Sequence, residues 1–420
     1  MQEFINKNYF VLMIFTLIFG VMFYDIISNI GFSYVDEICI VLVLILYIIK
    51  VYKSPNWRFN KTFLFVLGVF VFYLIYSILI GSNVIKGILL DFFIQIKPYL
   101  AFFCVYALKP ELNPNQKKII QQIVLIFSFY MLFVGLLNLV VGPRLVWTLF
   151  GHESRFATAS SILALLYLHC SDYKKVDKLI FIMLLAIGLL SGRSKLFGFF
   201  ALCTLMLLYM NNSFKMKLNT QNTLFIILAI GLTAFVAKDK IQFYFITGGL
   251  GDGRSEEDLY ARMALYYFST YIFMKYIPFG SGFASYGTYA SGVYYSPIYE
   301  ELYMNNMYGL TKADPKFMAD TYYPALAQFG FVGAALFFFF WTNLAWKAIK
   351  VYEKGCKKEV VIALMIIFFF LIECTSDSTI THNRGIFLMM VLGMIFSDTQ
   401  RKIENQQLLQ LNENGENSTR

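Results

Sequence analysis

Long apolar stretches follow one another along almost the whole chain and are separated by short polar segments. Most of them approach the roughly 17 to 25 residues that a helix needs to cross a bilayer, and several fall on the short side. Lipid offers no partner to an unpaired backbone N–H or C=O, so such segments must be helical. The pattern predicts an all-α, polytopic membrane protein with about twelve transmembrane helices. The apolar stretches lie near 9–32, 35–52, 62–81, 88–108, 119–141, 156–170, 178–191, 195–210, 223–237, 322–346, 360–375 and 385–397.

One polar segment, from Lys238 to Thr321, is far longer than the other connections. Connections of that size usually carry function. Within it, residues 256–276 place apolar side chains near one helical face before Pro278, which predicts a short amphipathic helix on or near the membrane surface. The chain is thereby divided into helices one to nine in 1–237, the large outer loop in 238–321, helices ten to twelve in 322–400 and a polar, frayed tail in 401–420.

Lysine and arginine gather in every second connection. The cytoplasmic loops of membrane proteins carry such an excess of basic residues. We therefore expect both termini in the cytoplasm and the loop 238–321 on the outer side, where any chemistry should take place. The basic connections contain Lys50, Lys53, Arg58 and Lys61; Lys109, Lys117 and Lys118; Lys174, Lys175 and Lys178; Lys215 and Lys217; and Lys347, Lys350, Lys354, Lys357 and Lys358.

Composition narrows the possible classes of protein. Hydrophobic residues make up 58% of the chain and charged residues only 15%, which excludes a soluble domain of this length. The formal charge of +9 lies largely in short loops, so it indicates membrane orientation rather than nucleic-acid binding. The six cysteines form no CxxC or Cys/His cluster, and the chain has no DxD, P-loop, GxSxG or HExxH motif. We therefore expect no metal, no nucleotide and no other cofactor.

The turn Ser191-Gly192-Arg193-Ser194-Lys195 places two cations between two apolar segments on the expected outer side. A charge that faces lipid costs several kcal/mol, so Arg193 should point into the helix bundle or into a polar cavity. The alternative is that the side chain snorkels to the interface. A functional role is favoured for Arg193, and both interpretations stay open for Lys195.

Other charged residues of the outer side are weaker candidates. Arg262 lies in the predicted amphipathic helix and could equally belong to a solvated face. Arg254 follows a glycine-rich stretch that we interpret as a hinge, because no strand precedes it and no P-loop lysine follows. Asp320, where the long loop returns to the membrane, could be a general base or a helix N-cap. Candidates of second rank are His152, His382 and Arg384.

Four charged residues fall inside or at the ends of the apolar segments: Asp25, Asp91, Lys97 and Glu373. Such groups need partners, and Asp91 could pair with Lys97, although their spacing is not that of facing residues on a helix. Intramembrane charges also occur in proton-coupled transporters, which keeps a flippase or secondary transporter as an alternative. A transporter would normally show two similar halves and short loops, so the long outer loop and the single cluster of outer cations count against transport.

Three stretches, in order, resemble the O-antigen polymerase and O-antigen ligase family of bacterial envelope polysaccharide assembly. They are Leu189–Lys195, which opens a helix; Arg262, followed after a helix by Ile277–Phe283; and Asp320–Gly333, which leads into the next helix. The resemblance covers roughly residues 180 to 345. It implies an enzyme of the bacterial inner membrane that transfers an oligosaccharide from undecaprenyl diphosphate to an acceptor hydroxyl, without nucleotide or metal.

Arg193 and Arg262 match the family's arginines and would hold the diphosphate by charge-assisted bonds. Ligases of the family carry a histidine where this chain has Asp320 and Thr321, which favours a repeat-unit polymerase over a ligase that delivers the chain to lipid A core. Asp320 is then the first candidate for the base, and the anomeric configuration should invert. Tyrosines of the loop, Tyr286 among them, could offer flat faces to sugar rings or could form an interfacial aromatic belt.

The implied partners are undecaprenyl-diphosphate-linked oligosaccharides, membrane lipid and a chain-length-regulating membrane protein. The product could be O-antigen, capsule or exopolysaccharide. The expected site consists of Asp320, Arg193 and Arg262 as catalytic residues, with Lys195, Arg254, Tyr286, Tyr322, His382 and Arg384 as further contacts to diphosphate and sugar.

Overall fold

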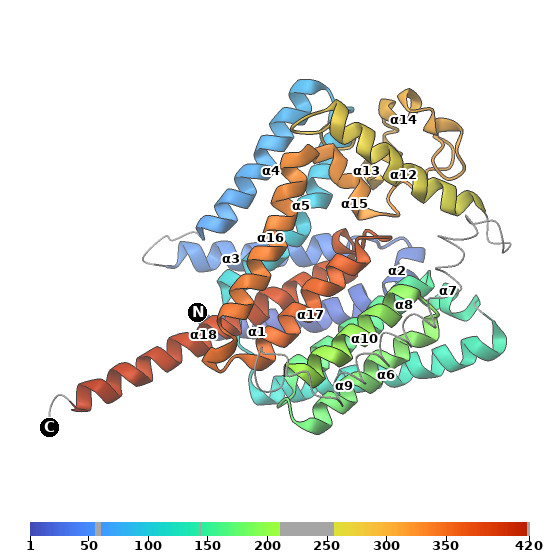
Figure 1. Cartoon of the computed structure of the whole chain (residues 1–420). Coiled ribbons are helices and arrows are strands. Elements are labelled where there is room, and N and C mark those ends of the chain that lie inside the picture. The colour runs from blue at the N-terminus through green and yellow to red at the C-terminus, as the bar shows by residue number, and fades with distance from the viewer. Residues whose placement is uncertain (55–59, 143, 211–255, 418–420) are drawn as a thin grey trace.

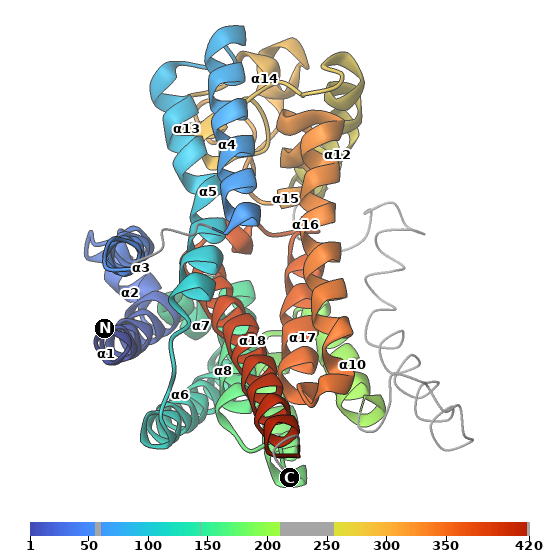
Figure 2. The same cartoon turned by 90° about the vertical axis from the view of Figure 1, so that its left-hand side faces the viewer.

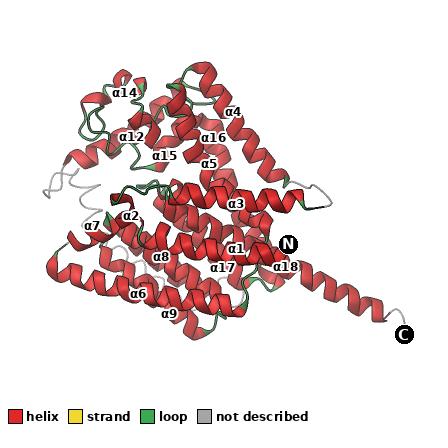
Figure 3. Cartoon of the chain, turned by 180° about the vertical axis from the view of Figure 1, so that it is seen from behind, coloured by secondary structure: helices red, strands yellow, loops and turns green. Residues whose placement is uncertain are grey.

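The computed structural model describes residues 1–54, 60–142, 144–210 and 256–417 (Figure 1). These ranges contain helices and loops and no strand (Figure 3). The predicted span at 223–237 and Arg254 lie outside them. The α-helices are α1 (Gln2–Phe15), α2 (Tyr24–Asn29), α3 (Val35–Tyr52), α4 (Lys61–Ile80), α5 (Ile85–Leu108), α6 (Pro114–Val141), α7 (Arg144–Phe150), α8 (Glu153–Cys170), α9 (Lys175–Ile187), α10 (Ser194–Tyr209), α12 (Glu256–Lys275), α13 (Tyr289–Val293), α14 (Pro297–Glu301), α15 (Tyr322–Ala325), α16 (Gly330–Lys350), α17 (Lys357–Glu373) and α18 (Asn383–Asn417).

Within the described ranges, five helical stretches are long and apolar enough to cross a membrane. By length and composition, they make the chain a multi-pass membrane protein, as the hydropathy pattern predicts. The predicted first span near 9–32 is not one regular helix, because a π-helical segment from Thr16 to Met22 interrupts it between α1 and α2. The five stretches are Gln2–Met22, Lys61–Ile80, Ile85–Leu108, Pro114–Val141 and Tyr322–Lys350.

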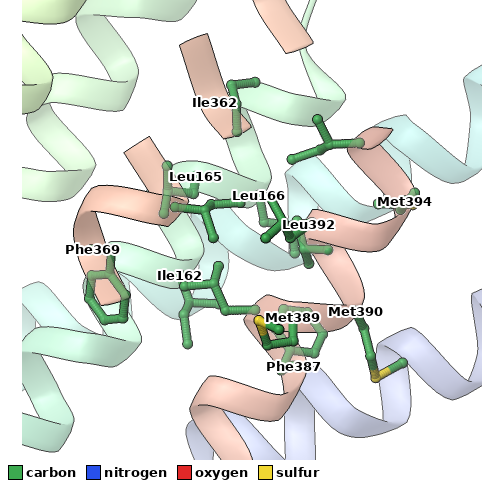
Figure 4. Close-up of a cluster of buried hydrophobic side chains, with 14 of the residues drawn as sticks. Ile162, Leu165, Leu166, Ile362, Phe369, Phe387, Met389, Met390, Leu392 and Met394 are labelled. Carbon is green, nitrogen blue, oxygen red and sulfur yellow. The ribbon is translucent and has the colours of Figure 1, made fainter. Parts of the chain in front are cut away.

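The core of the molecule lies where α8, α17 and α18 meet (Figure 4). Ile162 and Leu165 of α8 are fully buried among side chains that include Ile362 of α17 and Leu392 of α18. From Phe156 to Cys170, α8 is buried on all sides. A helix buried all round belongs to the interior of a bundle, so α8 is surrounded by other helices. By contrast, α6, which packs against α8, and the more distant α4 expose many apolar side chains.

The last helix, α18, packs against α5 and continues well past residue 400. Gly393 permits this close packing, because a Cβ there would lie 2.6 Å from the carbonyl oxygen of Phe102. Residues 401–404 do not fray as expected, since they pair with charges of the α5–α6 connection and of α17. These pairs are Arg401–Glu111 at 2.9 Å, Lys402–Glu359 at 2.8 Å and Lys109–Glu404 at 2.9 Å.

The described part of the large loop forms a small cap beside the ends of α4, α5 and α16 (Figure 2). The cap and both termini lie at opposite sides of the molecule (Figures 1 and 2). The helix predicted over 256–276 is present as α12, but the expectation of which face is buried was wrong. The side chains buried in the cap's own apolar core are those of Leu265 and Ile272, and the apolar side chains expected to share one buried face are exposed. Its exposed face carries Met263, Tyr267 and Met274.

Candidate functional site

A cation-lined cavity of about 1270 Å³, open in part to solvent, lies at the side of the molecule where the cap is found. The beginnings of α8, α10 and α18 and the segment before α15 form its wall. We call it the outer cavity, after the side on which the charge pattern of the sequence predicts the large loop to lie. Its charged lining residues are Arg155, Arg193, Lys316, Arg384, Asp320 and Asp377, joined by His152 and His382. Four permanent cations against two carboxylates make this wall attractive to an anion.

Arg193 stands at the N-cap position of α10, which begins at Ser194. Gly192 before it has a φ of +65°, a left-handed conformation that glycine adopts without strain. The backbone N–H of Arg193 donates to the Ser191 hydroxyl oxygen at 3.3 Å, which closes the turn. The guanidinium therefore reaches the outer cavity beside the partly positive N-terminus of a helix, which also favours a bound anion.

Asp25 of α2 connects two arginines of the outer cavity. Its carboxylate accepts from Arg384 Nη2 at 2.8 Å and forms an ion pair with Arg155. The Arg384 side chain is only 6% exposed, and its Nε has no hydrogen-bond partner among the described residues. Both guanidinium groups are thus fixed at their positions before any ligand arrives, and Arg384 retains an N–H that a ligand could use.

Asp320 lines the outer cavity and forms an ion pair with Arg262 of α12. The two side chains are 28% and 29% exposed, so the pair lies at a partly solvated edge. The alternative that Asp320 caps a helix is wrong, since Thr321 occupies the N-cap of α15 and gives no side-chain cap hydrogen bond. The pair joins the cap to the segment that leads into α16.

Buried polar groups from the α17–α18 connection complete the wall. Asp377 accepts from the hydroxyls of Ser154 and Thr379, each at 2.8 Å. Burial alone would raise the pKa of Asp377, but the charge of Lys195 and the hydrogen bonds from the two hydroxyls hold that pKa below its usual value.

The two histidines of the outer cavity favour their neutral form. For His382, burial and the nearby arginines lower the pKa, and Asp377 offsets this only in part. For His152, burial and the charge of Arg193 lower the pKa. Neutral imidazoles can accept protons, so both residues add proton acceptors to a wall of cations.

The second and third family-like stretches pack directly on each other. The N–H of Gly282 donates to the carbonyl of Gln328 at 2.8 Å, and the N–H of Val332 donates to that of Pro278 at 3.2 Å. A Cβ on Gly330 would lie 2.3 Å from the backbone nitrogen of Gly280, so these two glycines allow the backbones to touch. The segment after α12 and the start of α16 thus form one unit.

Several expected contacts lie elsewhere. Tyr286 is fully buried, and its hydroxyl donates to the carbonyl of Leu265 at 2.7 Å, so it is part of the cap's core rather than a sugar platform. Tyr322 points away from the outer cavity into an apolar cavity between α4, α5 and α16, where its hydroxyl donates to Gln95 at 3.1 Å. Lys195 pairs with Glu373 at 2.7 Å and lies behind the wall.

The expected Asp91–Lys97 pair does not form. Lys97 instead pairs with Asp36 and Glu37 at the start of α3. Asp91 accepts the backbone N–H of Ala284 at 2.7 Å and anchors the cap to α5. Two residues six positions apart on one helix point in different directions. The carboxylate of Asp91 and the ammonium of Lys97 therefore pair with groups on other segments.

Arg155, Lys316 and Asp377 line the outer cavity but were not expected there. Arg155 stands in the first turn of α8, one position after Ser154 and three after His152, and its charge at the end of a predicted span was a signal that could have identified it. Asp377 had a similar signal, since it follows an apolar segment directly.

No protein-family model matches the chain, and no curated protein sequence matches it. The fold and the outer cavity therefore define a class only: an all-helical, multi-pass membrane protein with an anion-attracting cavity beside a folded cap.

Proposed function

We propose that the chain polymerises undecaprenyl-diphosphate-linked oligosaccharide repeat units by metal-independent, inverting glycosyl transfer. The observation that carries this proposal is that two of the three family-like stretches line one cavity and that an arginine of the other stretch forms an ion pair at its edge. Arg193 of the first stretch and Asp320 of the third line it, and Arg262 of the second pairs with Asp320. Distant parts of a sequence that converge on charged groups in one cavity are typical of an active site.

The proposed orientation places the outer cavity and the cap on the outer face of a bacterial inner membrane. The described connections at the other side carry the lysines at 109, 117, 174 and 357, and basic connections face the cytoplasm. Both termini then lie in the cytoplasm, and the chain crosses the membrane about twelve times.

The cations would act on the leaving group. An acceptor hydroxyl attacks the sugar carbon bonded to the diphosphate, the carbon–oxygen bond to phosphate breaks, and the leaving diphosphate takes the electron pair. Arg193, Arg155 and Arg384 can neutralise this developing charge through charge-assisted hydrogen bonds. Since Asp25 already holds two of them, little reorganisation is needed during the reaction.

Asp320 would receive or orient the proton of the acceptor hydroxyl. Its carboxylate is partly exposed on the cavity wall, while Arg262 fixes its position. The acceptor in this scheme is the non-reducing end of a new lipid-linked unit. Attack from the face opposite the diphosphate inverts the anomeric configuration.

A ligase is the second candidate, and His382 favours it. The family's ligases carry a histidine near Asp320, and this chain brings the neutral His382 to the same cavity from another connection, 3.2 Å from the Ser378 hydroxyl. In that case the acceptor is a hydroxyl of lipid A core instead of a second repeat unit.

The test uses purified full-length protein with single lipid-linked repeat units and EDTA, and without nucleotide. A polymerase makes a ladder of longer chains, whereas a transporter makes none, and a ligase makes product only when core acceptor is added. Arg193→Gln should slow ladder formation by about 100- to 1,000-fold. Asp320→Asn should lose far more activity than His382→Gln.

Arg144→Gln is the matched control, because Arg144 begins α7 at the same side but is exposed and does not line the outer cavity. Its rate should stay within about twofold of the wild-type rate, as expected for a surface substitution. The proposal would be contradicted if folded wild-type protein made no ladder, or if Arg193→Gln and Arg144→Gln lost the same fraction of the wild-type rate.

A further inference from the structure

Two hollows at the opposite side of the molecule share one basic wall. They measure about 860 and 660 Å³, and the first residues of α6, α17 and the distal part of α18 enclose them. We call the smaller one the basal hollow. The residues common to both hollows are Lys117, Lys358, Lys402 and Glu359.

His169, near the end of α8, is the most informative residue of the basal hollow. It is 2% exposed, and neither ring nitrogen has a hydrogen-bond partner among the described residues. Its Nε2 lies 3.5 Å from Asp398 Oδ2, which is longer than a good hydrogen bond. A buried imidazole without a partner is costly, so its place on the wall of a hollow points to a polar ligand.

The basal hollow also has cations without acidic partners. Lys402 pairs with Glu359, and Arg401 pairs with Glu111 and Asp398. Neither of the remaining cations, Lys117 and Lys358, has a carboxylate within ion-pair distance in the described part of the chain; the ammonium of Lys358 donates to the Ser171 carbonyl at 2.6 Å. The lining of the basal hollow carries four cations, Lys117, Lys358, Arg401 and Lys402, against the three carboxylates of Glu111, Glu359 and Asp398, so an excess of positive charge faces the buried imidazole.

We propose that the basal hollow binds the phosphate group of a net-anionic ligand. Lys117 and Lys358 would contact the phosphate oxygens as point charges, and His169 would donate a hydrogen bond to one of them. The phosphate could come from the headgroup of an anionic phospholipid, since basic pockets between transmembrane helices bind such headgroups, or from a soluble phosphate. This inference does not depend on the proposed function.

The experiment measures binding to the purified full chain in neutral detergent by native mass spectrometry and by thermal unfolding. The probes are phosphatidylglycerol, phosphatidylcholine and inorganic phosphate. We expect phosphatidylglycerol to bind and to raise the unfolding temperature, and phosphatidylcholine to do neither. Binding should be about 30-fold weaker in Lys117→Gln/Lys358→Gln.

The control Lys53→Gln/Lys118→Gln removes the same charge from exposed positions outside the basal hollow and should bind like the wild type. A second variant, His169→Phe, removes the buried donor without changing the number of lysines and should also weaken binding. Stabilisation by inorganic phosphate as well would assign the site to soluble phosphates, and stabilisation by phosphatidylglycerol alone would assign it to a lipid headgroup.

The wild type alone can overturn the proposal. If it does not distinguish phosphatidylglycerol from phosphatidylcholine and inorganic phosphate has no effect, the basal hollow is not a phosphate site. The same conclusion follows if both lysine pairs weaken binding equally, because the effect would then be one of net charge.

Discussion

Asp25 is the residue whose replacement should most clearly test the architecture of the outer cavity. Asp25→Asn keeps the shape of the side chain but removes the charge that faces Arg384 and Arg155. The two contacts differ greatly in burial. The side chains of Asp25 and Arg384 are 3% and 6% exposed, whereas that of Arg155 is 48% exposed.

This difference in burial determines how much free energy of unfolding each substitution should remove. Breaking a buried ion pair from one side leaves an uncompensated charge and costs about 3 to 5 kcal/mol. A half-exposed pair contributes about 1 kcal/mol or less, because solvent screens it. Asp25→Asn should therefore lose about 3 to 5 kcal/mol, nearly all of it through Arg384, and Arg155→Gln should lose about 1 kcal/mol at most. The double variant Asp25→Asn/Arg384→Met should lose clearly less than the sum of its single changes.

The assay is unfolding by increasing mole fraction of sodium dodecyl sulfate in mixed micelles, followed by tryptophan fluorescence and helicity. Asp172→Asn is the control, because Asp172 forms a fully exposed ion pair with Lys174, and its midpoint should equal that of the wild type. If Asp25→Asn stayed within about 1 kcal/mol of the wild type, or if the Asp25 and Arg384 changes were additive, the two side chains would not form a stabilising buried ion pair.

Three further outcomes follow from the same structure. Glu373→Gln should cost about 3 kcal/mol because it leaves Lys195, whose side chain is only 14% exposed, without its carboxylate partner, and Lys195→Met/Glu373→Gln should recover most of that loss in the same unfolding assay. Gly330→Ala should abolish recovery of folded protein by size-exclusion chromatography, since its Cβ would contact backbone at 2.3 Å, whereas Gly68→Ala, in open space on α4, should not. The pKa of His382 is lower in the folded chain than in the unfolded chain, so stability should fall as the pH drops below about 6.5. His382→Gln should make this fall less steep, by up to about 1.4 kcal/mol per pH unit.

The helices were predictable from sequence because the physics that selects them is local. A bilayer allows only segments whose backbone groups bond internally, so apolar length and turn residues were sufficient to find α4, α5 and α16. Hydropathy could not identify the π-helical interruption at Thr16–Met22, since that segment is as apolar as its neighbours. The continuation of α18 beyond residue 400 depends on ion pairs with distant segments, which local composition does not encode.

The site was predictable only in part, because the sequence shows which charged residues are unusual but not which of them meet in the fold. The charges of Arg193, Arg262 and Asp320 stood out because such groups are costly near a membrane. Which charges would meet depends on packing: Asp25 lies 130 positions from Arg155 and 359 from Arg384. Tyr286 was wrongly expected to contact sugar. An aromatic residue in a polar loop can also pack in the interior of a folded cap, and Tyr286 does so.

Whether the outer cavity holds a lipid diphosphate can be measured by binding alone. Purified wild-type protein and Arg193→Gln should be compared by native mass spectrometry with an undecaprenyl-diphosphate-linked sugar and with its monophosphate counterpart. The wild type should retain the diphosphate in preference to the monophosphate, and Arg193→Gln should lose this preference. Equal retention of both lipids by the wild type, or an unchanged preference in the variant, would contradict the proposed function.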